Sequence, residues 1–261
     1  MKRRGLTLGG LMGVSVVLFA AGATVYSQLE YKLAYRWDPG RKFSHAIYVV
    51  GKVQTSGAAV REVKLQYQAV WEVAEADPKE DRYLVTETVK NYLGPELDLR
   101  SFDVPPPGET IRRSLDSCGR VLSVQGYAQG SRFHLLPLVF VPGLSVAGDN
   151  PKWQLTGKLL APLGEVEVET TAEMEYSLEK VLTNYKNRSH YCALVRLGGK
   201  YTYRSEDGDR ELEGTIQGRV FFDLVEQMVV DYQLEDHRQE GIKSKDWTRA
   251  TTLEITALEQ K

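Results

Sequence analysis

The longest regular hydrophobic pattern of the chain covers residues 165–178, where apolar and polar side chains alternate. Its even positions carry an almost entirely apolar column, and its odd positions are mostly glutamate. A period of two residues is typical of a β-strand with one apolar and one solvated face. At roughly 3.3 Å per residue this strand would be more than about 40 Å long. Such a length favours a broad, curved antiparallel sheet over a small sandwich.

The same alternation recurs in the first half of the chain. In residues 61–73, Val63, Leu65, Tyr67 and Trp71 lie on one side. A polar turn at 77–81 leads into a second strand at 82–92, which predicts an antiparallel hairpin. Residues 43–53 predict another strand. Because Tyr48 and Val50 make its second side apolar too, we expect this strand to be covered on both faces.

Further strands follow from the same reasoning. We expect strands at 29–37, 189–204, 211–222 and 228–237, a short hairpin from 109–115 and 120–125, and a final strand at 247–258 that closes the sheet. The long strand extends to residue 186, with a phase slip near Glu179 that is consistent with a bulge. Gly214 and Gly218 lie on one side of a strand and indicate a bend or a close approach.

Residues 133–141 form the most apolar run after the N-terminal segment, with Pro137 inside it. Proline argues against a long helix or a central strand, so we expect a short helix or an apolar flap on the inner face of the sheet. The predicted fold is mainly β: one or more long curved antiparallel sheets, open and half-barrel-like, with few short helices and an N-terminal signal helix.

The N-terminal segment predicts export. Lys2, Arg3 and Arg4 precede an apolar stretch at 6–21, and small residues at 21–23 suit cleavage. Residues 1–27 are therefore a signal peptide or an N-terminal anchor. Residues 28–261 form a β-rich extracytoplasmic domain, either undivided or in two sub-halves, 28–125 and 126–261. The domain would be periplasmic or extracellular, or held at the inner membrane facing outward. In that last case only the uncleaved segment touches the membrane.

Charge and cysteine content narrow the picture slightly. With 33 basic and 35 acidic residues, nothing favours nucleic acid as a partner. In an oxidising compartment Cys118 and Cys192 could form one disulfide, and the alternative is two separate buried thiols.

No catalytic or cofactor motif is present in the sequence. The four histidines lack metal-ligand spacing, and there is no nucleophile elbow, phosphate loop or dinucleotide fingerprint. We therefore predict a protein that is not an enzyme and has no catalytic residue, metal or cofactor. The glutamates between residues 165 and 179 could attract a basic partner or a cation. A solvated outer face paired with Lys and Arg across strands is the favoured interpretation.

The apolar faces of these strands must be shielded from water. They could surround an apolar cavity with residues 133–141 as its lid, or they could pack into a filled core, and the sequence leaves both open. The candidate ligand-binding residues on this apolar face are Val63, Leu65, Tyr67, Trp71, Phe133, Leu136, Phe140, Val166, Val168, Met174, Tyr176 and Leu178.

Residues 35–43, the run 136–139 and the late strand at 191–195 carry a resemblance that rests on their spacing and general character. Together with the long alternating strands, they resemble bacterial secreted β-rich proteins of unknown function. The expected architecture is similar to the open half-barrel of periplasmic lipoprotein carriers and lipid-binding lipoproteins. The opening strand also resembles the start of the vitellogenin-type lipid-transfer domain. The chain lacks the lipidation cysteine of the lipoprotein members.

The leading hypothesis from sequence is a non-enzymatic exported protein that binds an apolar ligand, a lipid or a lipidated peptide, on the inner face of a curved sheet. The alternative is a structural or interaction module that joins a cell-envelope assembly through a sheet edge, with another envelope protein as its partner.

Overall fold

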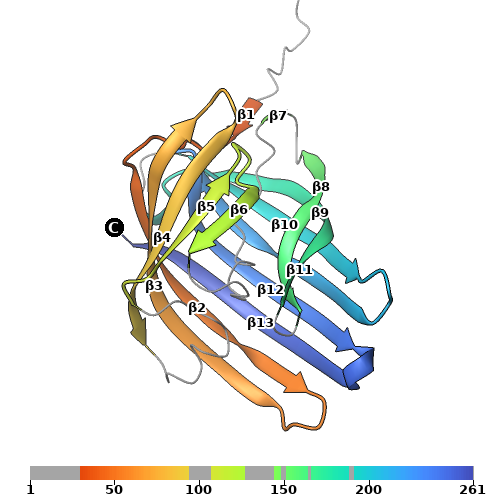
Figure 1. The fold of residues 1–261 in the computed structure, drawn as a ribbon. Helices are drawn as coiled ribbons and strands as arrows, with labels where there is room; N and C mark the ends of the chain where they lie inside the picture. Colours follow the sequence, from red (N-terminus) through yellow and green to blue (C-terminus); the bar gives the residue numbers. More distant parts are fainter. Residues whose placement is uncertain are drawn as a thin grey trace, which may run out of the picture.

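The computed structural model describes residues 30–93, 107–126, 144–147, 151–163, 166–187 and 191–260. Eleven strands form one antiparallel sheet in the order β6-β5-β4-β3-β2-β13-β12-β11-β10-β9-β8. The sheet is strongly curved and is not closed into a barrel (Figure 1). The predicted mainly β, open half-barrel-like fold is therefore confirmed.

The strands are long, as their alternation indicated. Their bounds are β2 Lys42–Thr55, β3 Arg61–Asp77, β4 Arg82–Leu93, β5 Thr110–Leu115, β6 Val121–Gly126, β8 Lys152–Leu163, β9 Val166–Leu182, β10 Cys192–Arg204, β11 Arg210–Asp223, β12 Met228–Ile242 and β13 Trp247–Gln260. A separate two-stranded pairing joins β1 (Glu30–Leu33) to β7 (Leu144–Ala147), and single 3-10 turns cover Tyr185–Asn187 and Lys243–Lys245.

Most predicted strands are present with the predicted partners. The β3–β4 and β5–β6 hairpins form as expected, and the register between β9 and β10 shifts at Glu179, where the phase slip predicted a bulge. Strand β8 was not predicted. Gly157 and Pro162 interrupt its sequence, and its apolar residues from 159 to 161 are consecutive, so the local pattern does not alternate.

Strand β13 does not lie at an edge of the sheet. It pairs with β12 on one side and with β2 on the other, from Arg249 opposite Thr55 to Gln260 opposite Ser44. The last strand thus joins the sequence halves, β2–β6 and β8–β13, into one sheet. The expected final strand is present, but it completes the middle of the sheet.

The expectation that β2 is covered on both faces is wrong. Ile47 and Val49 are buried on the inner side, but Val50 on the other side is 47% exposed and Tyr48 is half-buried. The sheet is a single layer here, so the outer side of β2 faces solvent.

Glycines allow bulky inner side chains to lie flat on the sheet. A Cβ at Gly214 would lie 2.1 Å from Cζ of Tyr201, and one at Gly218 would lie 2.7 Å from Cδ2 of Leu234. Both glycines therefore mark close approaches, as the sequence indicated.

One end of the inner face is crossed by the chain after β1; we call it the capped end. Tyr35 donates its N–H to the carbonyl of Ser117, and Trp37 donates its indole N–H to the carbonyl of Asp116. The Tyr35 ring also packs edge-on against Phe222. The segment thus ties the β5–β6 turn to the β11 side of the sheet. The opposite end, with the β2–β3 and β12–β13 turns, is the far end.

Two predicted features lie outside the described residues: the signal helix at 1–27 and the apolar run at 133–141, with Phe133, Leu136 and Phe140. Within the described part of the chain, no helix is long and apolar enough to cross a membrane.

Candidate functional site: the inner face of the sheet

The inner face gathers the predicted apolar residues into one cluster. The cluster contains residues of both β3 and β9, although five strands lie between β3 and β9 in the sheet. The buried members among the predicted set are Val63, Leu65, Tyr67, Trp71, Val168, Met174, Tyr176 and Leu178. Val166 opens β9 in phase with Val168, and its side chain is not described.

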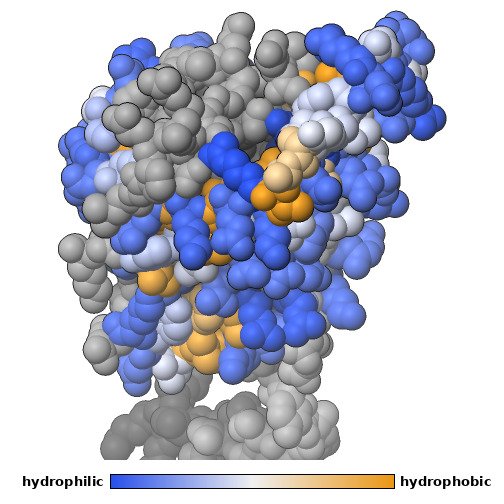
Figure 2. Space-filling model, turned by 90° about the horizontal axis from the view of Figure 1, so that it is seen from below, coloured by the Kyte–Doolittle hydropathy of each residue, from blue (hydrophilic) through white to orange (hydrophobic). Residues whose placement is uncertain are grey.

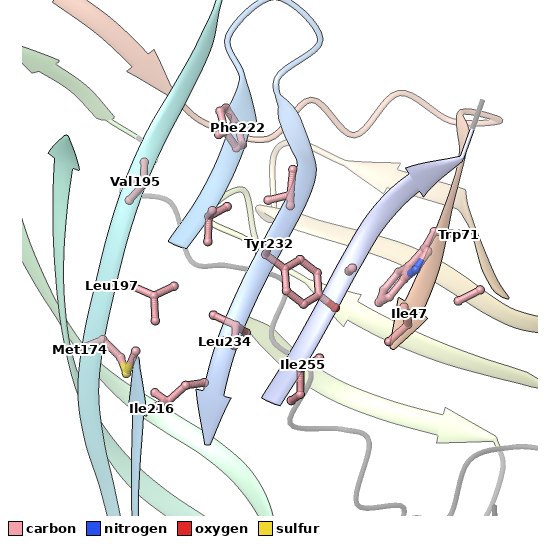
Figure 3. Close-up of a cluster of buried hydrophobic side chains, with 14 of the residues drawn as sticks. Ile47, Trp71, Met174, Val195, Leu197, Ile216, Phe222, Tyr232, Leu234 and Ile255 are labelled. Atoms are coloured by element: carbon pink, nitrogen blue, oxygen red, sulfur yellow. The ribbon is translucent and has the colours of Figure 1, made fainter. Parts of the chain in front are cut away.

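The middle of the face is apolar from one strand to the next. On the same side of the sheet lie Leu197 of β10, Ile216 of β11, Leu234 of β12, Ile255 of β13 and Ile47 of β2 (Figure 3). Tyr232 of β12 lies near the ion pair of Glu87 on β4 and Arg113 on β5, four and five strands away. Burial, and then the Glu87 charge, raise the pKa of Tyr232. The curvature therefore brings distant strands within reach of each other.

Charged side chains interrupt the apolar face at two places. Toward the capped end, Arg113 pairs with Glu87, and its guanidinium carbon lies 4.9 Å from the ring centre of Trp71. Both charged groups are almost fully buried. Burial of a charge is tolerated when it is paired, and the aromatic face adds a cation–π contact.

The second place is on β12 toward the far end. The inward column of β12 begins with Tyr232 and Leu234 and continues with Asp236, Arg238 and Glu240. Nη2 of Arg238 donates to Oδ2 of Asp236 at 2.6 Å, and the hydroxyl of Tyr201 donates to Oδ1 at 2.6 Å. Both carboxylate oxygens of Asp236 are thus satisfied.

A second ion pair lies directly beside this group. Nε of Arg249 on β13 donates to Oε1 of Glu240 at 2.9 Å, and its Nη2 bonds to Oε2. This fork-to-fork geometry is the strongest that arginine makes with a carboxylate. Arg238, Asp236, Arg249, Glu240 and Tyr201 together are called the far-end polar cluster below.

Arg238 keeps one N–H without a partner. Its Nε is buried and has no hydrogen-bond acceptor among the described residues, although the residue is only 5% exposed. Gly214 and Thr251, its neighbours across β11 and β13, are small. Leaving a buried donor unpaired costs about 1–3 kcal/mol, and more when the group is charged. This N–H is therefore the least satisfied feature of the cluster.

The charges of the far-end polar cluster balance. Burial lowers the pKa of Arg238, but Asp236, Tyr201 and Glu240 outweigh it, and the net direction is upward. Arg238 therefore stays charged. Two guanidinium groups face two carboxylates, so the cluster is neutral as a whole.

The sequence pattern did not single out Asp236, Arg238 or Glu240 as inward-facing residues. The predicted strand ended at residue 237. From Glu235 to Glu240 the side chains on both faces of β12 are polar, so apolar and polar residues no longer alternate. Glu87 and Arg113 lie within predicted strands, but they are charged residues in otherwise apolar columns, so their burial was not predicted. One sequence signal could have identified them. Each of these residues lies two residues away from a buried residue of the same strand and therefore points to the same, inner face.

The outer face is polar, as the favoured interpretation of the glutamate column predicted. Glu179 pairs with Arg196 at 2.6 Å and lies 3.7 Å from Arg219, and Glu173 pairs with Lys200 at 3.2 Å. Seen from below, hydrophobic residues show only as small areas between hydrophilic ones (Figure 2).

Two hollows of about 930 and 1120 Å³ are lined largely by outward polar residues such as Gln217 and Gln239. Neither is the apolar cavity that the sequence left open as one of two alternatives.

The other chemistry-bearing residues are separate from one another. Cys118, in the β5–β6 turn, and the buried Cys192, at the start of β10, are not joined by a disulfide, so of the two alternatives the structure has two separate cysteines. The two lie on widely separated strands of the sheet order, which sequence spacing cannot reveal. His45 is buried against the carbonyl of Val230. No group of metal-ligating side chains is present within the described residues.

The fold and the site together define a class: an open antiparallel half-barrel with an apolar inner face that carries buried, charge-balanced polar clusters. The chain matches no protein-family model, no curated protein and no solved structure.

Proposed function

We propose that the protein is an exported, non-enzymatic carrier that binds an apolar ligand, a lipid or a lipidated peptide, on the inner face of its sheet. The observation that carries this proposal is the continuous apolar cluster on the concave side of a sheet that does not close. A hydrophobic core of this kind usually lies between two layers of secondary structure. The described part of the chain forms a single sheet layer on this side.

The orientation of the inner side chains supports the same proposal. Leu234, Tyr201 and Met174 each lie flat over a glycine of the neighbouring strand. Side chains that lie along the sheet leave the concave side wider than side chains that stand upright. A width of this kind suits an extended hydrocarbon chain.

The proposal predicts that a bulky residue on the inner face weakens binding. Ile255 points inward and Thr256 outward on the same strand. We expect Ile255→Trp to weaken binding of N-phenyl-1-naphthylamine, a neutral apolar dye, at least about fivefold because it occupies ligand volume. Thr256→Trp should leave binding unchanged. Circular dichroism and the melting temperature establish that both variants are folded before dye titration.

Native mass spectrometry of the protein purified from its own host provides a second measurement. A bound mass that leaves in organic solvent and matches a lipid or a lipidated peptide is expected. A protein that carries no ligand and binds no dye would contradict the proposal. A co-purified envelope protein without lipid would instead favour assembly through a sheet edge.

A further inference from the structure

We infer that the far-end polar cluster recognises the ligand's polar head through a neutral oxygen acceptor, the carbonyl of an acyl ester or amide. This inference rests on the proposed function and specifies the class of ligand. It excludes free fatty acids and other simple anionic amphiphiles as the preferred ligands.

The first step of the argument is hydrogen-bonding capacity. Both oxygens of Asp236 are occupied by Tyr201 and Arg238. Both oxygens of Glu240 are occupied by Arg249. Among the buried polar atoms of the cluster, only the Nε–H donor of Arg238 has no partner within the described residues. A donor without a protein partner calls for an acceptor from the ligand.

The second step is charge. The cluster has two guanidinium groups and two carboxylates and is neutral. A carboxylate or sulfate placed against Arg238 would leave one uncompensated negative charge in a site from which water is largely excluded, and such a charge is costly. A carbonyl oxygen accepts the same hydrogen bond and keeps the site neutral.

The third step is position. Arg238 follows Tyr232 and Leu234 in the same inward column of β12, at intervals of two residues. An amphiphile lying along this column would place its hydrocarbon over Leu234 and Ile255 and its acyl carbonyl at Arg238. An ester or amide linkage joins chain to head group in acylglycerols and in N-acylated peptides, and both present this carbonyl.

The test compares three ligands of equal chain length by displacement of N-phenyl-1-naphthylamine from the full-length protein: methyl palmitate, hexadecyl sulfate and hexadecane. They offer a neutral acceptor, a permanent anion and no acceptor. We expect methyl palmitate to bind at least about tenfold more tightly than either of the others, the effect of one hydrogen bond to a buried charged donor.

Two conservative variants separate recognition from general electrostatics. Arg238→Lys keeps a cation beside Asp236 and removes the Nε–H, so the preference for the ester should fall to less than about threefold. Arg196→Lys makes the same change on the outer face, where Nε pairs with Glu179, so the tenfold preference should persist. Hexadecane affinity should be the same in both variants and in the wild type, which shows that the apolar face is intact.

The outcomes distinguish the two proposals. If the wild type binds neither the dye nor any of the three ligands, the carrier function itself is wrong. If it binds all three with equal affinity, or prefers the sulfate, the carrier function stands and the carbonyl inference is overturned. An equal loss of ester preference in Arg238→Lys and Arg196→Lys would also overturn it, because the preference would then not depend on the Nε–H of Arg238.

Discussion

At the scale of single residues, the buried charges are the least expected feature of this protein. Buried ion pairs add little net stability, and apolar residues of the same volume often serve as well. The fold therefore does not require Glu87–Arg113 or the far-end polar cluster. Their presence on the inner face, and not on the solvated outer face, is the reason for our proposal that the far-end polar cluster recognises a ligand.

His45 supplies a prediction about pH. Burial lowers its pKa to about 4, against an ordinary value of 6.5, while Asp231 and the Val230 carbonyl act in the opposite direction. The unfolded chain therefore binds more protons than the folded protein between these two values, and stability falls as the pH drops from about 6.5 toward 4. At pH 5 His45 should cost roughly 2 kcal/mol relative to pH 7.5.

The measurement is the free energy of unfolding in urea at pH 7.5 and pH 5, for the wild type and for His45→Gln. The side chain of Gln keeps a donor for the Val230 carbonyl but does not titrate. The loss of stability on acidification should be about 2 kcal/mol smaller in the variant. Equal losses in both proteins would show that His45 does not stay neutral in the fold.

At the scale of elements, the close contacts between strands β10 and β11 decide the local shape of the sheet. Gly214 lies beneath the Tyr201 ring, which crosses to reach Asp236. At Gly198, on β10, an added methyl group would have only one atom within 4 Å, the Ile216 carbonyl oxygen at 4.0 Å. The two glycines therefore differ in what a side chain would displace.

Gly214→Ala should destabilise the protein by about 1–3 kcal/mol, because the new methyl group must push the Tyr201 ring aside. Gly198→Ala should change stability by less than about 1 kcal/mol, and in the stabilising direction, because it reduces the entropy of the unfolded chain without a clash. Urea unfolding curves of both variants give the comparison. A neutral Gly214→Ala would mean that Tyr201 is free to move and that its bond to Asp236 is not fixed.

At the scale of the whole molecule, the pairing of β2 with β13 joins the two halves of the sequence. Trp71 on β3 and Trp153 on β8 lie on opposite sides of this junction and belong to one apolar cluster. Because the sheet is continuous and its inner side chains contact one another, we expect one cooperative unfolding transition.

Variants that keep Trp71 or Trp153 as the sole tryptophan test this expectation. Their fluorescence in urea should report the same midpoint, and far-UV circular dichroism should coincide with both. Two separated midpoints would instead support sub-halves at 28–125 and 126–261 that unfold independently.

The local sequence determined where most strands lie and which residues face inward, because a period of two residues records the two faces of a strand directly. The columns of β3 and β9 are examples. Features were not predicted where the sequence pattern is ambiguous. Strand β8 has consecutive apolar residues, and Asp236 to Glu240 are charged on a buried face.

Only the tertiary structure decided which distant strands are neighbours and which buried charges meet. The pairing of β13 with β2, the approach of Tyr201 to Asp236 and the reach of Tyr232 toward Arg113 depend on sheet order and curvature. These contacts join residues far apart in the chain, and no local pattern encodes them, because a strand's alternation is the same whichever partner it pairs with.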